Sequence, residues 1–589
     1  MTAGSDRWDF TELFADEAAL EAALEELKAR AEALEAWRER LETLDAEGFL
    51  ELIGALEAFT DLAHRVYAYA ALRFYEDSLD ENVQALFSRV RALVSELSTK
   101  TLFFEIWWKN LPEDKARAYL EAAGERYRYW LEEMRAWRPY TLSEEAERAI
   151  TLKNVAAKAP PRVYATLTDR YEIRFEVEGQ PVTIRRSELS KYVQDPRPEV
   201  RRAAYDAALA LFSDEAIVLG ELYRLVVQDW GNEYLKLRGF ARPIQARNKI
   251  NDLPDEVVKA VLSAAHEHRG VFQDYFRLKA RALGLKKLSR YDLYAPVAKE
   301  AKTFRFEDAL QLVEEAFSRF DPEFARLMRR VIEAGHVDVY PRKGKRAGAF
   351  SYSPAPGLTP YLLLNFQGEA RDVATLAHEL GHAIHAMLAA DHPVFTFHAP
   401  LPLAETASTF AEMLLVDLLL EKENDPRLKA QILFDQLDDH YATIERQAYF
   451  ARFEIAAHDA LFAGEPLEAA HRAYQQTLED QFGDAVEVPE AFRFEWLMVP
   501  HFYNTPFYVY AYSFGQLLVL SLYARYREEG AAFIPRLKRI LAAGGSRPPV
   551  ELLKSEGFEI ADPGFWQAGY RVIAEEVERL KALLPALSN

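Results

Sequence analysis

Long stretches of the chain have the spacing of amphipathic helices, and this pattern limits the possible fold more than any other feature of the sequence. Residues 16–44 (DEAALEAALEELKARAEALEAWRERLETL) contain neither glycine nor proline, and leucine and alanine recur at intervals of three and four. Residues 49–72, 82–108 and 112–137 repeat the pattern, but Phe and Trp interrupt any regular heptad. We therefore predict a helical bundle or hairpin rather than a long coiled-coil rod.

Two segments interrupt the helical pattern. Residues 171–184 (YEIRFEVEGQPVTI) alternate on both sides of a Glu178-Gly179-Gln180 turn and predict a β-hairpin. Residues 337–366 contain glycines, prolines and short alternating runs, which predict two or three strands with loops. A proline-marked helix start near residue 198 suggests a domain boundary close by. We predict a mainly α chain with an N-terminal helical domain over residues 1–204, including a β-hairpin near 170–184, and a second domain over residues 205–589.

The composition excludes several kinds of protein. The 589 residues include no cysteine, so disulfides, thiolate metal sites and a cysteine nucleophile are excluded, and any metal must bind to His and carboxylates. The 93 acidic and 72 basic side chains give a net charge of −21, which argues against sequence-independent binding of nucleic acid. The N-terminal segment MTAGSDRWDFTELF lacks the pattern of a secretory leader, and the apolar runs are shorter than the roughly 20 residues of a membrane span. We expect a cytoplasmic protein without membrane contact.

The most informative motif is His378-Glu379-Leu380-Gly381-His382, an H-E-x-x-H sequence inside strongly helical text. On a helix, positions i and i+4 are one turn apart, so both imidazoles project from the same face and can reach one zinc ion at about 2.0–2.1 Å. Glu379 projects in another direction and can act on a water molecule without being a ligand. The motif therefore predicts a catalytic zinc site with Glu379 as the general base.

A catalytic zinc needs a third protein ligand and one open position. Glu405 and Glu412 lie on a predicted helix over residues 403–420, seven residues apart and on one face, and the spacing alone does not choose between them. His385 is poorly placed to share an ion with the two motif histidines, so we assign it to helix packing or to support of the site. The candidates downstream of the motif are His385, His392, His398, Glu405 and Glu412.

The string DVATLAHELGHAIH, followed by PLAETASTFAEML, resembles the M3 family of zinc peptidases. Within that family it is most similar to the oligoendopeptidase F branch, which is related to thimet oligopeptidase and neurolysin. There the third ligand is a Glu within an E-x-x-S-x-x-x-E pattern, and residues 405–412 match this pattern residue by residue. The resemblance implies that Glu405 completes a site for one Zn²⁺ per chain and that Glu412 orients a ligand histidine.

The same resemblance assigns roles to two further segments. Residues 501–515 (HFYNTPFYVYAYSFG) are similar to a His followed by a tyrosine-rich segment, whose hydroxyls stabilise the oxyanion and bind substrate. His501 and Tyr512 match best, Tyr508 is a second donor, and Tyr510 competes with it. Residues 348–351, which begin with Gly348, and residues 360–365 resemble a strand and loop beside the zinc helix, where a sheet edge lined by Tyr352 could hold an extended peptide.

The resemblance also implies an architecture and a function. The expected fold is a large, helical, two-lobed zincin-type body that encloses a deep substrate channel, with a small β-sheet next to the zinc helix and the catalytic domain in residues 205–589. The expected activity is that of a zinc-dependent oligoendopeptidase, which hydrolyses internal bonds of short unstructured peptides. The oligomeric state stays open between monomer and homodimer.

Two alternatives accompany this prediction. A zinc carboxypeptidase or dipeptidyl carboxypeptidase would need a cationic group for the substrate C-terminal carboxylate. The candidates are Arg342, Lys343, Lys345 and Arg346, a run that we otherwise interpret as a solvated loop. A helical scaffold without catalytic activity is the second alternative, and it would purify without stoichiometric zinc.

Overall fold

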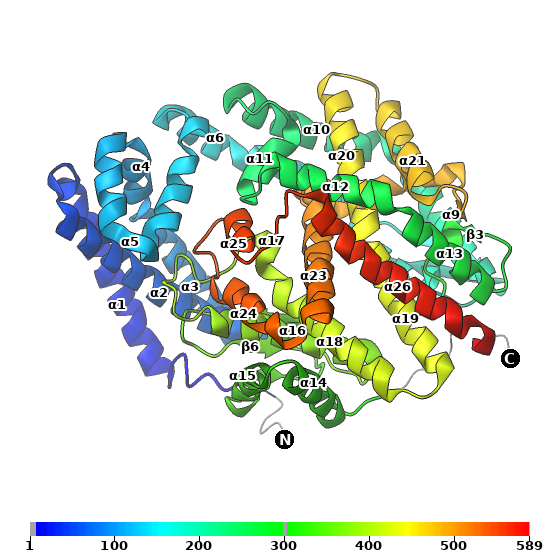
Figure 1. The fold of residues 1–589 in the computed structure, drawn as a ribbon. Helices are drawn as coiled ribbons and strands as arrows, with labels where there is room; N and C mark the ends of the chain where they lie inside the picture. The colour runs from blue at the N-terminus through cyan, green and yellow to red at the C-terminus, as the bar shows by residue number, and fades with distance from the viewer. Residues whose placement is uncertain (1–6, 298–302, 588–589) are drawn as a thin grey trace. The chain divides into compact units, whose positions relative to one another are not determined.

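Helices make up most of the computed structural model, which describes residues 7–297 and 303–587, and the predicted mainly α class is confirmed (Figure 1). Residues 1–6, part of the segment examined for a leader, lie outside the described residues. None of the described helices combines the length and the apolarity needed to cross a membrane.

The chain forms two compact units, and each draws on three separate segments. Unit 1 comprises Met1–Pro139, Ala301–Leu419 and Arg525–Gly557, and unit 2 comprises Tyr140–Glu300, Leu420–Ala524 and Phe558–Asn589. The chain therefore passes between units several times, and the units do not correspond to a single cut at residue 204. The predicted boundary between 204 and 205 stays a prediction.

Unit 1 contains the predicted N-terminal helices and the helix of the H-E-x-x-H motif. Its helices, in chain order, are α1 (Glu17–Glu35), α2 (Ala46–Glu76), α3 (Glu81–Thr99), α4 (Leu102–Asn110), α5 (Glu113–Ala136), α14 (Phe306–Phe320), α15 (Pro322–Glu333), α16 (Ala370–Leu388), α17 (Leu401–Ala404), α18 (Thr406–Lys422), α24 (Ile534–Ala542) and α25 (Pro549–Ser555). The last three residues of α18 belong to unit 2.

Local hydrogen bonds determine where the N-terminal helices begin and end. The carboxylates of Asp16, Asp45 and Asp80 each accept a backbone N–H of the first helical turn, which caps α1, α2 and α3. Residues 82–108 form two helices in place of the single predicted one, and the hydroxyls of Ser98, Thr99 and Thr101 donate to backbone carbonyls in the last turns of α3. Similarly, the helix predicted over residues 16–44 ends at Glu35 and continues as a 3₁₀ segment.

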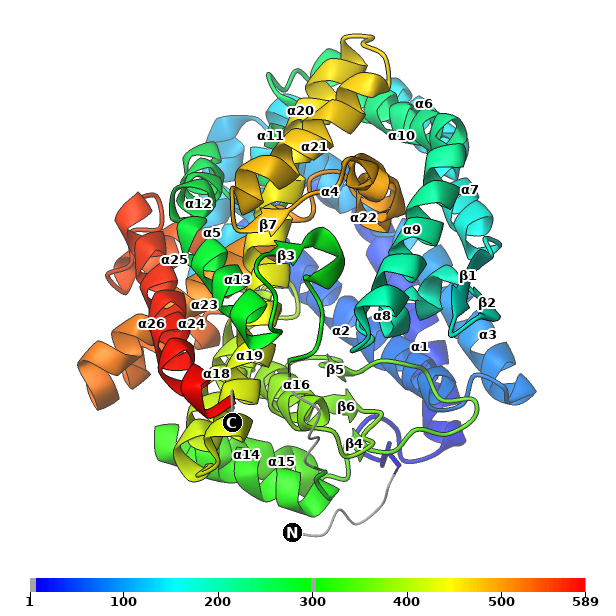
Figure 2. The ribbon, with the colours of Figure 1, turned by 90° about the vertical axis from the view of Figure 1, so that its right-hand side faces the viewer.

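A three-stranded sheet lies against α16, as predicted (Figure 2). Its strands are β4 (Val337–Asp338), β5 (Phe350–Tyr352) and β6 (Tyr361–Leu363), in the order β4-β6-β5. β6 pairs parallel with β4 and antiparallel with β5, so β5 is an edge strand. The apolar core of α1–α5 continues into β6 through Tyr361 and Leu363, and the Trp8 indole donates to the Leu362 carbonyl at 2.8 Å.

Unit 2 contains the predicted hairpin, formed by β1 (Ile173–Val177) and β2 (Gln180–Ile184), and a parallel pair, β3 (Leu288–Ser289) with β7 (Val486–Glu487). Unit 2 also contains the short helix α22 (Pro500–Asn504), which carries His501. Its helices are α6 (Glu144–Ala157), α7 (Ala159–Asp169), α8 (Leu189–Val193), α9 (Pro198–Asp214), α10 (Ala216–Trp230), α11 (Pro243–Ile250), α12 (Asp255–His268), α13 (Gly270–Ala282), α19 (Pro426–His440), α20 (Arg446–Phe462), α21 (Glu468–Phe482), α22 (Pro500–Asn504), α23 (Tyr510–Glu529), whose last residues belong to unit 1, and α26 (Pro563–Leu587).

Gly381 allows α16 to approach the start of α18 at backbone distance. A Cβ atom at this position would lie 2.6 Å from both the Ala407 carbonyl oxygen and the Ser408 Cα, closer than real Cβ contacts come. Both neighbours are backbone atoms, so no side-chain rotation can relieve the clash. The glycine in the motif therefore sets how closely the two helices pack.

Replacing Gly381 by alanine should force α16 and α18 apart and lower the free energy of unfolding by about 1–3 kcal/mol, the usual cost of overpacking. Gly54 provides the matched control, because it is an exposed helical glycine with no atom within 4 Å of an added Cβ. Gly54→Ala should raise stability by about 0.5–1 kcal/mol through helix propensity. Urea unfolding followed by circular dichroism measures both, and equal stability of Gly381→Ala and the unchanged chain would contradict the close approach.

Candidate metal centre

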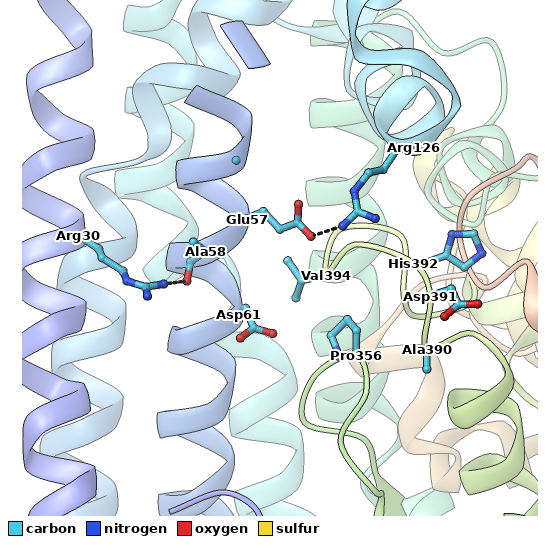
Figure 3. Close-up of a pocket in the computed structure, with 11 residues that line it drawn as sticks. Arg30, Glu57, Ala58, Asp61, Arg126, Pro356, Ala390, Asp391, His392 and Val394 are labelled. Atoms are coloured by element: carbon cyan, nitrogen blue, oxygen red, sulfur yellow. Dashed lines mark hydrogen bonds and ion pairs between the residues drawn. The ribbon is translucent and has the colours of Figure 1, made fainter. Parts of the chain in front are cut away.

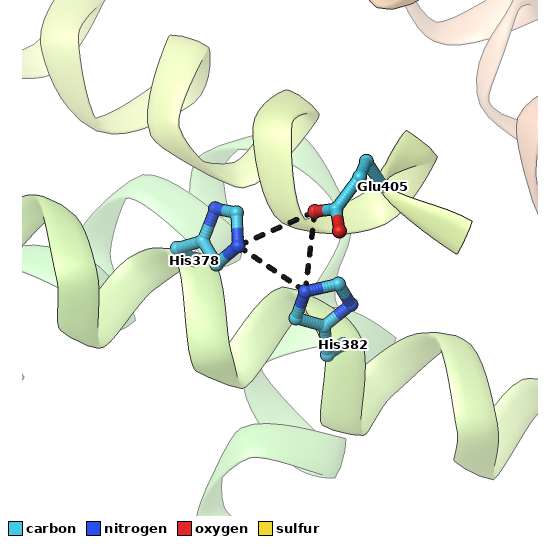
Figure 4. A group of neighbouring side chains, drawn as sticks. All are labelled: His378, His382 and Glu405. Atoms are coloured by element: carbon cyan, nitrogen blue, oxygen red, sulfur yellow. Dashed lines mark hydrogen bonds and ion pairs between the residues drawn. The ribbon is translucent and has the colours of Figure 1, made fainter. Parts of the chain in front are cut away.

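Three side chains of unit 1 point their donor atoms at one another (Figure 4). His378 and His382 project from adjacent turns of α16 with their Nε2 atoms 3.2 Å apart. Oε2 of Glu405 lies 3.3 Å from each of these nitrogens. Within the described ranges 7–297 and 303–587, this is the one group of three or more His and carboxylate side chains arranged to hold a metal ion.

The triangle of donor atoms fits a zinc ion. Tetrahedral coordination with bonds of about 2.0–2.1 Å puts neighbouring donors about 3.3–3.4 Å apart, and the three observed separations are 3.2–3.3 Å. Two imidazole nitrogens and one carboxylate oxygen form a donor set that zinc uses in catalytic sites. The chemistry and the spacing of the donors are therefore both suited to this ion.

Glu405 lies at a break in the helix that was predicted over residues 403–420. α17 ends at Ala404, Glu405 has φ −85° and ψ 1°, and α18 begins at Thr406. The Ser408 hydroxyl lies 2.9 Å from Oε2 of Glu405 and 3.0 Å from its carbonyl oxygen, so it supports both the side chain and the broken turn. The break directs the Glu405 carboxylate toward the two imidazoles.

Glu412, two turns into α18, holds one of the imidazoles. Its Oε1 lies 2.5 Å from Nδ1 of His378, which assigns the proton to Nδ1 and leaves Nε2 as the donor atom. Burial acts to lower the pKa of His378, but Glu405 and Glu412 together raise it to about 11. Burial acts to raise the pKa of Glu405, and the two histidines lower it well below its usual range. The carboxylates thus favour a cation at this position.

Glu379 lies outside the triangle and its carboxylate is not engaged. The residue is 6% exposed, and its side chain makes no hydrogen bond or ion pair with any residue in the described part of the chain. Burial raises the pKa of Glu379, while the positive charges of His378 and His382 oppose that change. A carboxyl with a raised pKa and no partner among the described residues has the properties of a general base that can accept a proton from a water molecule.

The other predicted ligand candidates have different surroundings. His385 is buried on α16, and burial lowers its pKa to about 4. His398 lies in the exposed part of the loop before α17, next to Phe397. Nε2 of His392 lies 2.8 Å from the Ala542 carbonyl oxygen. None of the three belongs to the convergent group found among the described residues.

His392 also borders a separate pocket of about 420 Å³ in unit 1 (Figure 3). Its wall carries paired charges: Arg126 binds Glu57, and Arg30 donates to the Ala58 carbonyl. The side chains of the metal-type group do not line it. We therefore assign no role in the chemistry to this pocket.

The loop that follows β4 holds the cations of the predicted carboxypeptidase alternative. Arg342 forms a bidentate ion pair with Asp338 at 2.6 Å, and Lys345, fully buried, lies 2.7 Å from the same carboxylate. Arg346 stacks over the Tyr75 ring at 4.4 Å. The interpretation of this run as a solvated loop is thus wrong for Arg342 and Lys345, because a buried carboxylate binds both of them.

Gly348 and Tyr352 lie at the sheet edge beside α16. The Gly348 carbonyl accepts a hydrogen bond from the Asn365 amide at 2.7 Å, and Gly348 has φ +83°. Tyr352 ends edge strand β5 and is half-buried; burial raises its pKa to about 12, and Tyr67 and Tyr75 act in the same direction. The positions are compatible with a peptide-binding edge, whose use stays a prediction.

His501, Tyr508 and Tyr512 form a second group, which lies in unit 2. Tyr512 Oη lies 3.3 Å from Nε2 of His501, and the Tyr508 ring stacks parallel to the imidazole at 6.2 Å. Burial and then the charge of Arg446 lower the pKa of His501, so its imidazole is neutral at pH 7. Tyr510 is not part of this group: it is fully buried and accepts a hydrogen bond from the Asn251 amide at 2.9 Å.

Two buried residues that the sequence analysis did not single out hold the peptide unit just before Tyr508. Arg247 donates from Nε to the Pro506 carbonyl at 3.0 Å, and Glu454 accepts the Phe507 N–H at 2.9 Å. Both ends of the Pro506–Phe507 peptide bond are therefore clamped, and Phe507 has φ +57°, a strained value for a bulky residue. Glu454 gave one sequence signal, a carboxylate within the otherwise apolar turn FEIAA.

Comparisons with known proteins agree with this geometry. The model of Peptidase family M3 matches residues 191–572, and that of Oligopeptidase F matches residues 107–170. Oligopeptidase PepF of Bacillus subtilis is 26% identical over 98% of this chain and 87% of its own length. An Oligoendopeptidase F homolog of Borreliella burgdorferi is also 26% identical, over 98% of both chains.

A solved structure has the same fold. The crystal structure of a candidate peptidase from Chlamydophila abortus superposes with a TM-score of 0.91, at 26% identity and over 98% of both chains. The M3 model covers more than half of the present chain and includes the H-E-x-x-H helix, the E-x-x-S-x-x-x-E segment and the tyrosine group. The chain therefore belongs to peptidase family M3 and is a peptide-bond hydrolase.

Proposed function

We propose that this peptidase is a zinc-dependent oligoendopeptidase, which cuts internal bonds of short, unfolded peptides. The observation that carries the proposal is the triangle of His378, His382 and Glu405, whose donor spacing suits tetrahedral zinc. The substrate class is supported by the relatives, which are described as oligopeptidases and oligoendopeptidases. The substrate channel, the cytoplasmic location and the oligomeric state stay predictions.

When bound, zinc supplies Lewis acidity, which makes water a nucleophile at neutral pH and polarises a carbonyl group. The protein residues then handle the protons. Glu379 accepts a proton from the attacking water and delivers it to the leaving amine nitrogen as the C–N bond breaks. Its raised pKa and its lack of a protein partner suit both steps.

Tyr512 is the proposed donor to the oxyanion that forms as water adds to the carbonyl carbon. Tyr512 Oη lies 3.3 Å from Nε2 of His501, and in the tautomer that carries its proton on Nε2 the imidazole donates to Oη, which leaves the phenolic O–H as the donor to substrate. Tyr508 stacks on the same imidazole and is the proposed second contact to the peptide. Tyr510 is not assigned a role in the reaction, since its hydroxyl is buried against Asn251.

The loop after β4 supports an endopeptidase better than a carboxypeptidase. Its cations Arg342 and Lys345 are bound to Asp338 and are not available to a substrate carboxylate. An internally quenched peptide, blocked at both ends, distinguishes the two activities because a strict carboxypeptidase cannot cut it. A scaffold without activity would cut neither kind of peptide.

The doubly blocked peptide should be cleaved at an internal bond, and a chelator should abolish cleavage. Glu379→Gln should retain zinc and lower kcat by about 10²–10⁴, because the general base is lost without a change in shape. Mass spectrometry of the products and a fluorescence rate assay measure the two effects. Cleavage at the wild-type rate by Glu379→Gln, or in the presence of the chelator, would refute the mechanism.

Substitutions of Glu405, Glu412 and Glu421 should change the affinity for zinc by different amounts. Glu405→Ala removes a ligand and should weaken binding by more than about 100-fold, whereas Glu412→Gln removes only support for His378 and should cost about 10–100-fold. Glu421→Ala changes an exposed residue at the end of the same helix and should have no effect. Competition with a fluorescent zinc chelator gives the affinities, and full affinity in Glu405→Ala would rule out the assigned ligand.

Loss of the hydroxyl should affect kcat/KM at Tyr512 but not at Tyr510, two positions away. Tyr512→Phe should lower kcat/KM by about 10²–10³, as loss of one oxyanion donor does elsewhere. Tyr510→Phe should leave kcat/KM unchanged and cost about 1 kcal/mol of stability, because Asn251 loses its partner. Steady-state kinetics and thermal unfolding measure both variants, and the reverse pattern would transfer the role to Tyr510.

A further inference from the structure

Unit 2 contains a cluster in which two guanidinium groups share one carboxylate. Arg290 is 1% exposed and forms an ion pair with Glu495, whose other oxygen accepts the Tyr474 hydroxyl at 3.0 Å. The Arg446 guanidinium lies 3.7 Å from the same carboxylate, beyond hydrogen-bond distance. Glu495 is thus already occupied, and its one negative charge faces the two positive charges of Arg290 and Arg446.

Arg446 has unused donors and access to solvent. Its side chain is 27% exposed, and it makes no hydrogen bond to any side chain or carbonyl within the described part of the protein. Its guanidinium lies over the Phe450 ring at 4.9 Å and near the Tyr294 ring at 5.8 Å, so aromatic faces hold its direction. The Tyr294 hydroxyl is buried and has no hydrogen-bond partner among the residues that the structure describes.

The position of Arg446 connects it to the His501 group. The Phe450 ring that carries the guanidinium packs at 5.2 Å against Phe502, the neighbour of His501 in α22. The charge of Arg446 also contributes to the lowered pKa of His501, after burial. Arg446 begins α20 directly after a π-helical segment, Tyr441–Glu445, a distortion that is frequent at functional sites.

We propose that Arg446 binds the C-terminal carboxylate of the peptide substrate. The inference rests on the proposed function, in which the His501 group contacts the peptide. A guanidinium binds a carboxylate through two parallel hydrogen bonds. Such a contact makes the rate of cleavage depend on a free carboxylate at the end of the peptide.

The test uses two internally quenched peptides of identical sequence, one ending in a free carboxylate and one in an amide. The unchanged enzyme should cleave the free acid with a kcat/KM about 10-fold or more higher, since a charged hydrogen-bond pair is lost with the amide. Arg446→Gln should abolish this difference by slowing only the free acid. Unchanged kcat/KM on the amide shows that the variant is folded, and Arg452→Gln, on the same helix, should behave as the unchanged enzyme.

Other outcomes overturn the proposal. Equal cleavage of both peptides by the unchanged enzyme, or equal slowing of both by Arg446→Gln, rules out a terminal carboxylate contact. A second pair of amidated peptides, differing by Glu against Gln at one internal position, tests the other source of a carboxylate. If Arg446→Gln instead slows cleavage of the Glu peptide and not of the Gln peptide, the ligand is an acidic side chain. If a chelator does not stop cleavage, the proposed function itself fails, and the inference fails with it.

Discussion

The close packing of α16 against α18 at Gly381 is the constraint on which the candidate metal centre depends. A side chain as small as a methyl group would collide with the backbone of Ala407 and Ser408. With glycine there, α16 brings its two imidazoles up to the carboxylates of Glu405 and Glu412. The three-stranded sheet and helices α14, α15 and α24 pack around α16 and hold it in that position. These elements of unit 1 therefore support the helix that carries both imidazoles.

Several charged side chains around the two groups are matched by a neighbouring charge or by a hydrogen bond. Glu405 and Glu412 surround His378 with negative charge that attracts a cation. Arg247 and Glu454 hold the two ends of one peptide bond and keep Phe507 in a strained conformation before Tyr508. Asp338 compensates Arg342 and Lys345. Arg446 differs from these, because its nearest carboxylate is already bound to Arg290 and Tyr474. Its partly exposed guanidinium has donors left for an anion, which is why a ligand is expected at this position.

Predictions from the sequence succeeded where the cause is local. The mainly α class, the hairpin around Gly179, the strands of residues 337–366 and the helix of the motif all follow from periodicity and turn chemistry over a few residues. They were less accurate where tertiary or side-chain effects compete with periodicity. The break at Ser98–Thr101 comes with three hydroxyls that bond to backbone carbonyls. The break at Glu405, in an otherwise helical pattern, comes with a carboxylate turned toward α16.

The sequence by itself determined that two imidazoles share one helix face and that any metal binds to nitrogen and oxygen, because a four-residue spacing and the lack of cysteine need no folding to take effect. The residue pattern left five candidates for a third ligand, and the family resemblance pointed to Glu405. Only the tertiary structure decided which carboxylate converges on the imidazoles, which tyrosines meet His501, and which arginine shares its nearest carboxylate with another arginine. These depend on contacts between residues that are far apart in the chain, and neither spacing nor composition specifies such contacts.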